Sequence, residues 1–305
     1  MKRINLGNSE LEVGEISLGC MRMHELEKKD AGYVIENAMD VGVDLFDHAD
    51  IYGKGKSEEV FSKAIDMNDD VRGKMKLQTK CGIRKGFFDF SKDHILESVE
   101  GSLRRLKTDY IDSLLLHRPD ALVEPEEVAE AFTTLKESGK VRHFGVSNQN
   151  PMQMELLKKY LKEDMIVNQL QLSIVHTPMM DAGFNVNMQH DPAFVRDSNV
   201  LEYCRLNDIT VQAWSPFQHG MIEGPFVGNK AFPEVNAKLQ ELAEKKGVTD
   251  SAIAIAWILR HPATIQPVVG TMNQERLRDI AKASDIEITR KEWYELYLAA
   301  GNELP

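Results

Sequence analysis

Residues 43–57 have the sequence VDLFDHADIYGKGKS. A short apolar run at 43–46 is followed by polar residues and by a turn that contains Gly53 and Gly55, and Ser57 begins a helical pattern. A short apolar run bounded in this way is typical of a buried strand in a parallel sheet. The segment therefore predicts one unit of strand, loop and helix.

The same unit recurs along the whole chain. Apolar runs short enough for buried parallel strands occur at residues 16–19, 43–46, 76–79, 113–116, 143–146, 166–169, 209–213 and 267–269. Helical patterns separate them: one apolar stripe runs from Ile95 to Leu106, and Thr249 can cap a helix that ends before Pro262. Strands that alternate with helices predict either a closed (β/α)8 barrel or an open, doubly wound sheet.

The number of strands favours the barrel. An open sheet that binds a dinucleotide usually carries G-x-G-x-x-G after its first strand, whereas residues 19–23 are GCMRM. Residues 3–6 and 11–13 flank Gly7 and Asn8 and predict a hairpin. We therefore predict an α/β fold, with a single (β/α)8 TIM-barrel domain over residues 1–305. Residues 1–15 form its hairpin, which caps the bottom of the barrel.

The composition excludes several classes of protein. The chain has 305 residues, of which 42% are hydrophobic, as in a folded globular protein. Its 37 basic and 48 acidic residues give a net charge of −11, which argues against a nucleic acid or an anionic membrane as partner. The first residues lack the apolar core of a signal peptide, and the longest apolar run, 252–259, is too short to span a bilayer. Three widely spaced cysteines form no disulfide framework and no zinc pair, so we expect a cytoplasmic protein without a metal. No sequence feature marks an oligomer interface.

Function in such a barrel resides where strands end and helices begin. Four titratable residues lie at or just beyond these ends: Asp47, Tyr52, Lys80 and His117. Lys80 follows a buried run and needs a counter-charge, for which Asp47 is the natural partner. The Lys80 cation would lower the pKa of the Tyr52 phenol, which could then donate a proton to a developing alkoxide. A neutral His117 imidazole can orient a carbonyl oxygen.

These residues also admit other interpretations. Asp47 and Lys80 can form an ion pair that only closes the barrel mouth, and Tyr52 can pack on the rim. A lone histidine after an apolar strand is more often structural. Lys80 can also form a Schiff base with a carbonyl substrate, as in barrel aldolases.

Six segments in order resemble the aldo-keto reductase family. They are FDHADIYGKGKSE (46–58), LLLHRPD (114–120), GVSN (145–148), NQLQLS (168–173), QAWSPF (212–217) and VVGTMNQERLRD (268–279). The resemblance extends from Ile16 to about Ile286. The RPD after His117 and the insert MMDAGFNVNMQHD (179–191) are most similar to the bacterial YdhF-type oxidoreductases of that family.

The resemblance implies an NADPH-dependent reductase of aldehydes and ketones. The family is a (β/α)8 barrel that binds NADPH in an extended form, and its catalytic tetrad falls on Asp47, Tyr52, Lys80 and His117. Tyr52 would be the general acid, Lys80 would depress its pKa and Asp47 would hold Lys80. His117 would position the carbonyl, and the hydride would come from the nicotinamide.

The resemblance also implies a set of NADPH-binding residues. The carboxamide would be held by Ser147, Asn148 and Gln169, and Trp214 would stack on the nicotinamide. The pyrophosphate loop carries Ser215, Phe217 and His219. The first loop, beside the nicotinamide, carries Cys20, Met21 and Arg22, and Asp47 also belongs to the set. The adenosine end comprises Gly270, Thr271, Met272, Arg276 and Asp279.

The residues at positions 270 and 48 depart from the pattern of the family. Many relatives have a lysine where this chain has Gly270, so one charge is lost from the site of the 2′-phosphate, while Arg276 remains. We therefore expect NADPH to be preferred over NADH, less steeply than in those relatives. His48 replaces a common threonine; its role is not predicted, and a narrower mouth is one option.

Two other functions compete with the reductase. Some members of the superfamily, such as potassium-channel β-subunits, bind NADPH and act as regulatory or sensor subunits with little turnover. An acidic chain without a docking stripe favours the free enzyme over that class. A Schiff-base aldolase that uses Lys80 is the third hypothesis. For the reductase, Arg22 and Arg118 favour a polar or anionic carbonyl substrate, although the substrate itself is not predicted.

Overall fold

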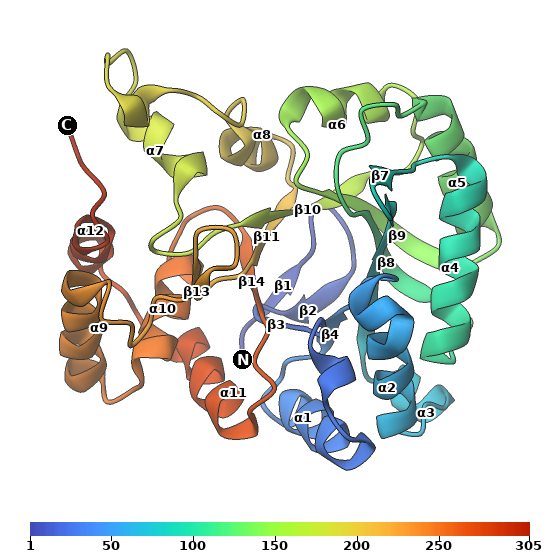
Figure 1. The fold of residues 1–305 in the computed structure, drawn as a ribbon, viewed down its shortest axis with the longest axis horizontal. Coiled ribbons are helices and arrows are strands. Elements are labelled where there is room, and N and C mark those ends of the chain that lie inside the picture. Colours follow the sequence, from blue (N-terminus) through green and yellow to red (C-terminus); the bar gives the residue numbers. More distant parts are fainter.

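Eight parallel strands close a barrel at the centre of the molecule (Figure 1). The computed structural model describes residues 1–305. In chain order the barrel strands are β3 (Ser17–Gly19), β4 (Leu45–Asp47), β5 (Lys76–Cys81), β8 (Ile111–Leu116), β9 (Val141–Ser147), β10 (Met165–Gln171), β11 (Thr210–Trp214) and β14 (Ile265–Val269). Each strand pairs with its neighbour in sequence, and β14 closes the barrel against β3. Each predicted apolar run overlaps one of them, so the predicted barrel is confirmed.

A hairpin closes the floor of this barrel. Strands β1 (Arg3–Asn5) and β2 (Glu12–Gly14) pair antiparallel, as predicted. Apolar residues in and beside the hairpin join a small buried cluster with residues of barrel strands β4, β8 and β10: Leu6, Leu11, Val13, Leu45, Leu115, Ile166 and Val167. The turn requires a glycine, because Gly7 has a φ of +56° and an added Cβ would lie 2.6 Å from the Ile166 carbonyl oxygen.

Helices surround the barrel (Figure 1). They are α1 (Lys28–Asp40), α2 (Lys56–Ala64), α3 (Asp69–Arg72), α4 (Lys92–Leu106), α5 (Pro125–Glu137), α6 (Pro151–Lys158), α7 (Pro178–Phe184), α8 (Val200–Leu206), α9 (Pro233–Lys246), α10 (Asp250–Leu259), α11 (Gln274–Ala281) and α12 (Arg290–Ala299). Four 3-10 turns join them: η1 (Met23–Glu25), η2 (Tyr52–Gly55), η3 (Asp191–Ala193) and η4 (Lys282–Asp285). Two small hairpins lie in the loops: β6 (Ile83–Arg84) pairs with β7 (Phe87–Phe88), and β12 (Gln218–His219) pairs with β13 (Gly224–Pro225).

Local chemistry explains where the predicted helices begin. The stripe from Ile95 to Leu106 is the buried face of α4, and the Ser91 side chain caps that helix by accepting from the His94 N–H. Thr249 caps α10 in the same way. Residues 252–258 of α10 are all buried, because α9, α11 and η4 pack around it. No helix is both long enough and apolar enough to cross a membrane.

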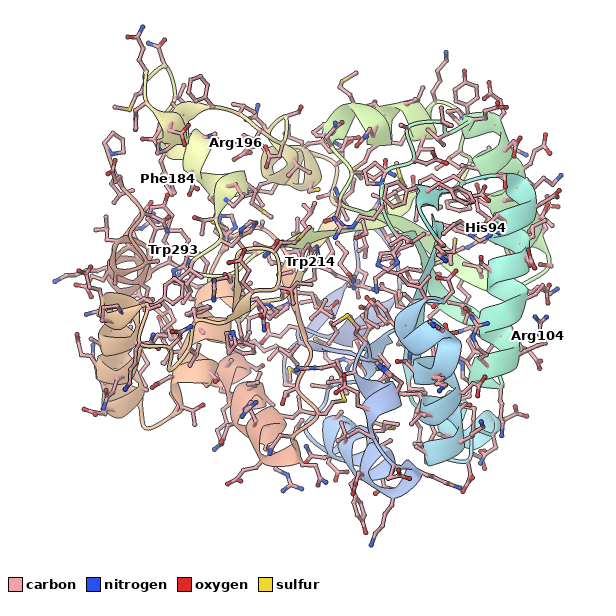
Figure 2. All side chains as sticks on the ribbon, viewed as in Figure 1. His94, Arg104, Phe184, Arg196, Trp214 and Trp293 are labelled. Carbon is pink, nitrogen blue, oxygen red and sulfur yellow. The ribbon has the colours of Figure 1, made fainter.

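Beyond α10, helix α12 completes the outer layer (Figure 2). Trp257 of α10 stacks on Trp293 of α12 with ring centroids 4.7 Å apart. Each indole N–H donates to the other residue's carbonyl oxygen, at 3.0 and 3.1 Å. These two hydrogen bonds satisfy both buried indole N–H groups, so α12 is fixed against α10.

Candidate active site

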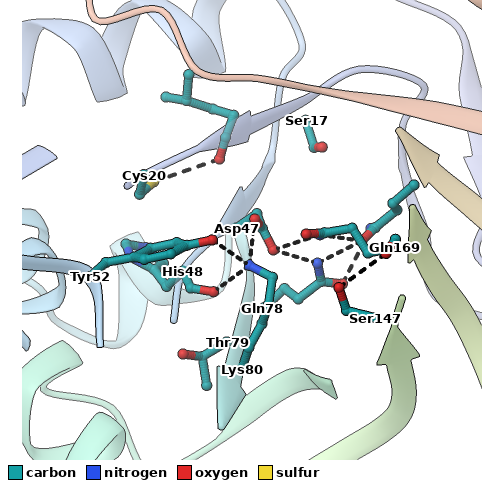
Figure 3. A network of polar contacts seen from close by, with 12 residues as sticks. Ser17, Cys20, Asp47, His48, Tyr52, Gln78, Thr79, Lys80, Ser147 and Gln169 are labelled. Atoms are coloured by element: carbon teal, nitrogen blue, oxygen red, sulfur yellow. Dashed lines mark hydrogen bonds and ion pairs between the residues drawn. The ribbon is translucent and has the colours of Figure 1, made fainter. Parts of the chain in front are cut away.

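Lys80 and Asp47 form a buried ion pair at the upper ends of adjacent strands β5 and β4 (Figure 3). Lys80 Nζ donates to Asp47 Oδ2 at 2.7 Å, to the His48 carbonyl oxygen at 2.8 Å and to Tyr52 Oη at 3.2 Å. The Lys80 side chain is 0% exposed. Its three acceptors match the three N–H groups of an ammonium ion, so the lysine has one fixed position.

The charge of Lys80 is maintained by these partners. Burial disfavours the charged form, but Asp47 and Tyr52 outweigh burial, and the pKa of Lys80 is raised above its ordinary value. Lys80 is therefore a cation at neutral pH. A Schiff base requires a free amine, so this environment argues against the aldolase hypothesis.

The loop after β4 returns the Tyr52 phenol to the lysine, as the glycines predict. Tyr52 begins η2, in which Gly53 and Lys54 both have positive φ. A Cβ at Gly53 would lie 2.5 Å from the His24 ring, so only glycine fits this turn.

The predicted lowering of the Tyr52 pKa is wrong in its net direction. Burial is the largest effect and raises the pKa of the phenol. Lys80 opposes that rise but does not outweigh it. Tyr52 is therefore protonated at neutral pH, which is the form that a proton donor needs.

His117 stands at the end of β8 with its ring edge-on to Tyr52, at a centroid distance of 5.9 Å. Burial lowers the pKa of His117 well below its ordinary value, and the Lys80 and Arg118 cations lower it further. Its Nδ1 is buried without a hydrogen-bond partner. The imidazole is therefore neutral and lies beside the phenol.

The second oxygen of Asp47 is held by two amides. Gln78 Nε2 donates to Asp47 Oδ1 at 2.6 Å, and Gln169 Nε2 donates to the same oxygen at 3.1 Å (Figure 3). Both oxygens of the carboxylate thus accept hydrogen bonds, and the carboxylate is fixed from below as well as by Lys80.

These amides belong to a glutamine ladder inside the barrel, which comprises Gln78, Gln169, Gln212 and Gln266. Gln212 Oε1 accepts from Gln78 at 2.7 Å and from Gln169 at 3.0 Å, while Gln212 Nε2 donates to Gln266 at 2.9 Å. Gln266 Nε2 donates to the Gly14 carbonyl oxygen at 2.7 Å. The ladder therefore connects Asp47 with the hairpin at the floor.

Three ladder residues, Gln78, Gln212 and Gln266, were not predicted from the sequence. The available signal is a glutamine inside an otherwise apolar strand, as in KLQT and VQAW. All three are 0% exposed. Buried amides are costly unless they are paired, so such a residue predicts a hydrogen-bonded partner within the barrel.

Ser147, Asn148 and Trp214, predicted to contact the nicotinamide, form one hydrogen-bonded group. Asn148 Nδ2 donates to Ser147 Oγ at 2.7 Å, and Trp214 Nε1 donates to Asn148 Oδ1 at 3.1 Å. Ser147 Oγ donates to the Gln169 carbonyl oxygen at 3.0 Å. The indole is held in place by its N–H, with its ring partly exposed at the mouth.

A nicotinamide fits the free atoms of this corner. Both N–H groups of the Gln169 side chain are used, by Asp47 and Gln212, but its Oε1 makes no hydrogen bond in the protein. A carboxamide N–H could donate to that oxygen, and a planar ring could stack on the exposed indole face of Trp214.

The first and last loops of the barrel also meet. Arg22, after β3, donates through Nη2 to the carbonyl oxygen of Gly270, after β14. Met21 is exposed, but Cys20 is 0% exposed. The Cys20 N–H donates to the Asp47 carbonyl oxygen at 2.8 Å and its carbonyl oxygen accepts from the Met23 N–H at 3.0 Å, so Cys20 presents no free group to a ligand in this structure.

The remaining predicted cofactor residues follow β11 and β14. Ser215 has a φ of +53°, Phe217 packs against the core, and the His219 ring lies 5.0 Å from that of Phe232. Thr271 is buried, and Met272 packs partly buried beside it. In α11, Arg276 is exposed without an acidic partner, while Asp279 accepts from Lys282 at 2.7 Å.

His48 does not narrow the mouth. Its side chain is 0% exposed and packs edge-on against Phe61 at a centroid distance of 4.6 Å. Burial lowers the pKa of His48 to about 3, so the ring is neutral. Nothing in the structure explains why a histidine is needed there.

Comparisons with known proteins give consistent matches. The family profile described as "Aldo/keto reductase family" matches residues 15–297. A 6-dehydroglucose reductase of Agrobacterium fabrum is 36% identical, covering 100% of both chains. The oxidoreductase YdhF of Escherichia coli is 32% identical, also covering 100% of both. An aldo-keto reductase from Klebsiella pneumoniae, crystallised in complex with NADPH, superimposes with a TM-score of 0.77 at 24% identity, covering 97% of this chain and 94% of that one.

Proposed function

This chain belongs to the aldo/keto reductase family, and we propose that it reduces aldehydes and ketones with NADPH, using Tyr52 as the proton donor. The family consists of NAD(P)H-dependent oxidoreductases, and the predicted similarity to YdhF is confirmed at 32% identity. One observation carries the proposal: Lys80, fixed by Asp47, directs its remaining N–H at Tyr52 Oη over 3.2 Å.

The geometry supports a simple division of roles. The nicotinamide supplies the hydride, and negative charge develops on the carbonyl oxygen as the hydride arrives. Tyr52 donates its phenol proton to that oxygen, and the Lys80 N–H then stabilises the phenolate that remains. Asp47 keeps Lys80 charged. The neutral His117 ring can donate an N–H to the carbonyl oxygen and so orient it beside the phenol.

NADPH is the cofactor that we propose for this site. Gln169 Oε1 and the Trp214 face would hold the nicotinamide, and Arg276 would meet the 2′-phosphate with its planar guanidinium. The Klebsiella pneumoniae neighbour was crystallised with NADPH. We therefore expect a higher kcat/KM with NADPH than with NADH. The three free cysteines fit a reducing cytoplasm as the site of action.

The test is loss of NADPH absorbance with an activated aromatic aldehyde such as 4-nitrobenzaldehyde. We expect turnover by the wild type and a loss of roughly 10²–10⁴-fold in kcat for Tyr52→Phe, because the proton donor is removed. Tyr33→Phe is the matched control, since Tyr33 is exposed on α1. NADPH binding, followed by fluorescence, should persist in both variants.

Other outcomes point elsewhere. Binding of NADPH without turnover by the wild type, across aldehydes and ketones, would indicate a regulatory or sensor subunit. Full activity in Tyr52→Phe would remove Tyr52 from the mechanism. Failure to bind NADPH would remove the cofactor assignment.

A further inference from the structure

Arg118 lies beside the candidate active site. It follows His117 directly at the end of β8, and its guanidinium carbon is 5.5 Å from the centre of the Trp214 ring. That indole is fixed by its bond to Asn148. Arg118 is therefore half-buried, it lies over the ring that we propose as the nicotinamide platform, and it directly follows the residue that we propose as the carbonyl-orienting group.

Arg118 differs from Arg72, Arg105 and Lys80 because it has no acidic partner. Arg72 pairs with Asp112, Arg105 with Glu58 and Lys80 with Asp47, all at 2.6 to 2.7 Å. Arg118 makes no hydrogen bond and no ion pair within the protein. Its guanidinium makes a cation–π contact with the face of the Trp214 ring.

The charge of Arg118 is consequently not neutralised at the mouth. Burial lowers its pKa, yet an arginine remains protonated at neutral pH. His117 and Tyr52 are neutral there, and the charge of Asp47 is balanced by Lys80. A half-buried cation with five N–H donors and no acceptor favours an anion from solution.

We propose that Arg118 binds a carboxylate on the substrate, so that the preferred substrates are aldehydes or ketones that carry a carboxylate group. The carbonyl oxygen would lie at Tyr52 and His117, and the planar carboxylate would accept two parallel N–H bonds from the guanidinium. This inference rests on the proposed reductase function and adds the class of its substrate. Phosphate is the competing anion, because the guanidinium fork can bind it through two N–H groups as well.

The experiment compares substrates of the same shape that differ in charge. The 3- and 4-carboxybenzaldehydes are each paired with the corresponding formylbenzamide, and kcat/KM is measured for all four with NADPH. For whichever carboxybenzaldehyde is the better substrate, we expect kcat/KM to exceed that of its formylbenzamide by roughly tenfold or more, which is the effect of one charge-assisted hydrogen bond. The difference should arise mainly from a lower KM. In Arg118→Gln the ratio of acid to amide should fall towards 1.

Two further variants keep the test specific. Arg118→Lys retains the positive charge but lacks the two parallel N–H groups of the guanidinium, so it should keep part of the preference for acid over amide. Arg104→Gln changes an exposed arginine on α4, on the far side of the barrel from Trp214 (Figure 2), and should leave the ratio unchanged. Thermal melting of each variant shows whether it is folded.

The outcomes separate the two levels of the argument. Equal kcat/KM for acid and amide in the wild type overturns the carboxylate inference and leaves the reductase intact. A preference for acid that Arg118→Gln and Arg118→Lys do not change also overturns it. The preference for glyceraldehyde 3-phosphate over glyceraldehyde can exceed the preference for acid over amide. If it does, and if Arg118→Gln loses it, the anion that Arg118 binds is a phosphate and the carboxylate inference is overturned. If neither acid nor amide is turned over while 4-nitrobenzaldehyde is reduced, the carboxylate inference alone is overturned. If 4-nitrobenzaldehyde is not reduced either, the proposed function itself has failed.

Discussion

Strand β5 has a buried cation near each end, and the two differ in how completely their surroundings are satisfied. Arg72 precedes the strand, and Lys80 lies close to its upper end. Near the lower end, Arg72 pairs with Asp112 at 2.6 Å and also donates to Thr108 Oγ1 at 2.9 Å and to two carbonyl oxygens. Asp112 Oδ2 accepts a further bond from the Leu77 N–H at 2.8 Å. Tyr110 stacks on the guanidinium at 3.8 Å. These groups satisfy one another, so we interpret this cluster as structural.

At the upper end, the cluster around Lys80 is fixed from below and open above. Asp47 and the glutamine ladder are fully buried, but the third N–H of Lys80 is directed at a phenol that is only partly buried. The His117 Nδ1 has no partner, and Arg118 has no counter-charge. The comparison indicates that chemistry resides where a rigid polar network ends in groups whose partners are not supplied by the chain.

The largest expected effects come from removing each cation in turn. Lys80→Met should reduce kcat by roughly 10²–10⁴-fold, because the phenolate of Tyr52 loses its stabilising charge. Arg72→Met should leave activity per folded molecule near wild type but cost up to roughly 3–5 kcal/mol of stability, since buried Asp112 keeps only the longer 3.4 Å ion pair with Arg142. Steady-state kinetics and urea unfolding of both variants measure the contrast.

The Lys80 variant needs a stability control. Lys80→Met also leaves Asp47 unpaired, so Asp47→Asn with Lys80→Met restores neutrality and should recover stability without recovering activity. Recovery of activity in that double variant would contradict the role of the Lys80 cation. A large activity loss in folded Arg72→Met would erase the distinction between the two clusters.

Much of the barrel was predictable because it depends on local pattern. Each strand, such as β8, is a short apolar run, and Thr249 caps its helix by a bond within the first turn. The convergence of Asp47, Lys80, Tyr52 and His117 follows from a rule of topology, since the strand ends of a barrel share one rim. The family resemblance then supplied the expected roles.

The missed features depend on contacts between distant strands. Gln78 and Gln212 are 134 residues apart in sequence and meet only through the register of the closed barrel. The Arg72–Asp112 pair spans 40 residues and likewise depends on packing. The direction of the Tyr52 pKa failed for a related reason: the neighbour that lowers it was evident, but the extent of burial that raises it was not.

An intermediate effect is expected within the glutamine ladder. Gln78→Met removes the 2.6 Å bond to Asp47, and we expect kcat to fall roughly tenfold with little change in the KM for NADPH, since one charge-assisted bond is lost. Gln266→Met is the matched control, because it breaks the ladder at the far end from Asp47. Stability should fall in both.

The ladder variants distinguish positioning from simple packing. If both variants lose the same stability and only Gln78→Met loses kcat, Gln78 positions Asp47. An equal loss of kcat in both would mean that the ladder acts only through the rigidity of the barrel, and the upper cluster would then be less separate from the floor than its geometry indicates.

The smallest expected effect is that of pH on carbonyl reduction. The pKa of His117 lies well below its ordinary value, and those of Tyr52 and Lys80 are raised, so none of the three titrates between about pH 6 and about pH 9. The kcat for reduction should therefore be flat over that range, provided that the chemical step limits it.

Alcohol oxidation needs the phenolate of Tyr52, whose small fraction grows roughly tenfold per pH unit below its pKa, so the reverse rate should rise with pH. Measuring both directions with one aldehyde and alcohol pair tests this. Burial raises the pKa of Asp50, on the loop between Asp47 and Tyr52, to about 6, so Asp50→Asn is the control. An inflection in reduction near pH 6.5 that persists in Asp50→Asn would contradict a neutral His117.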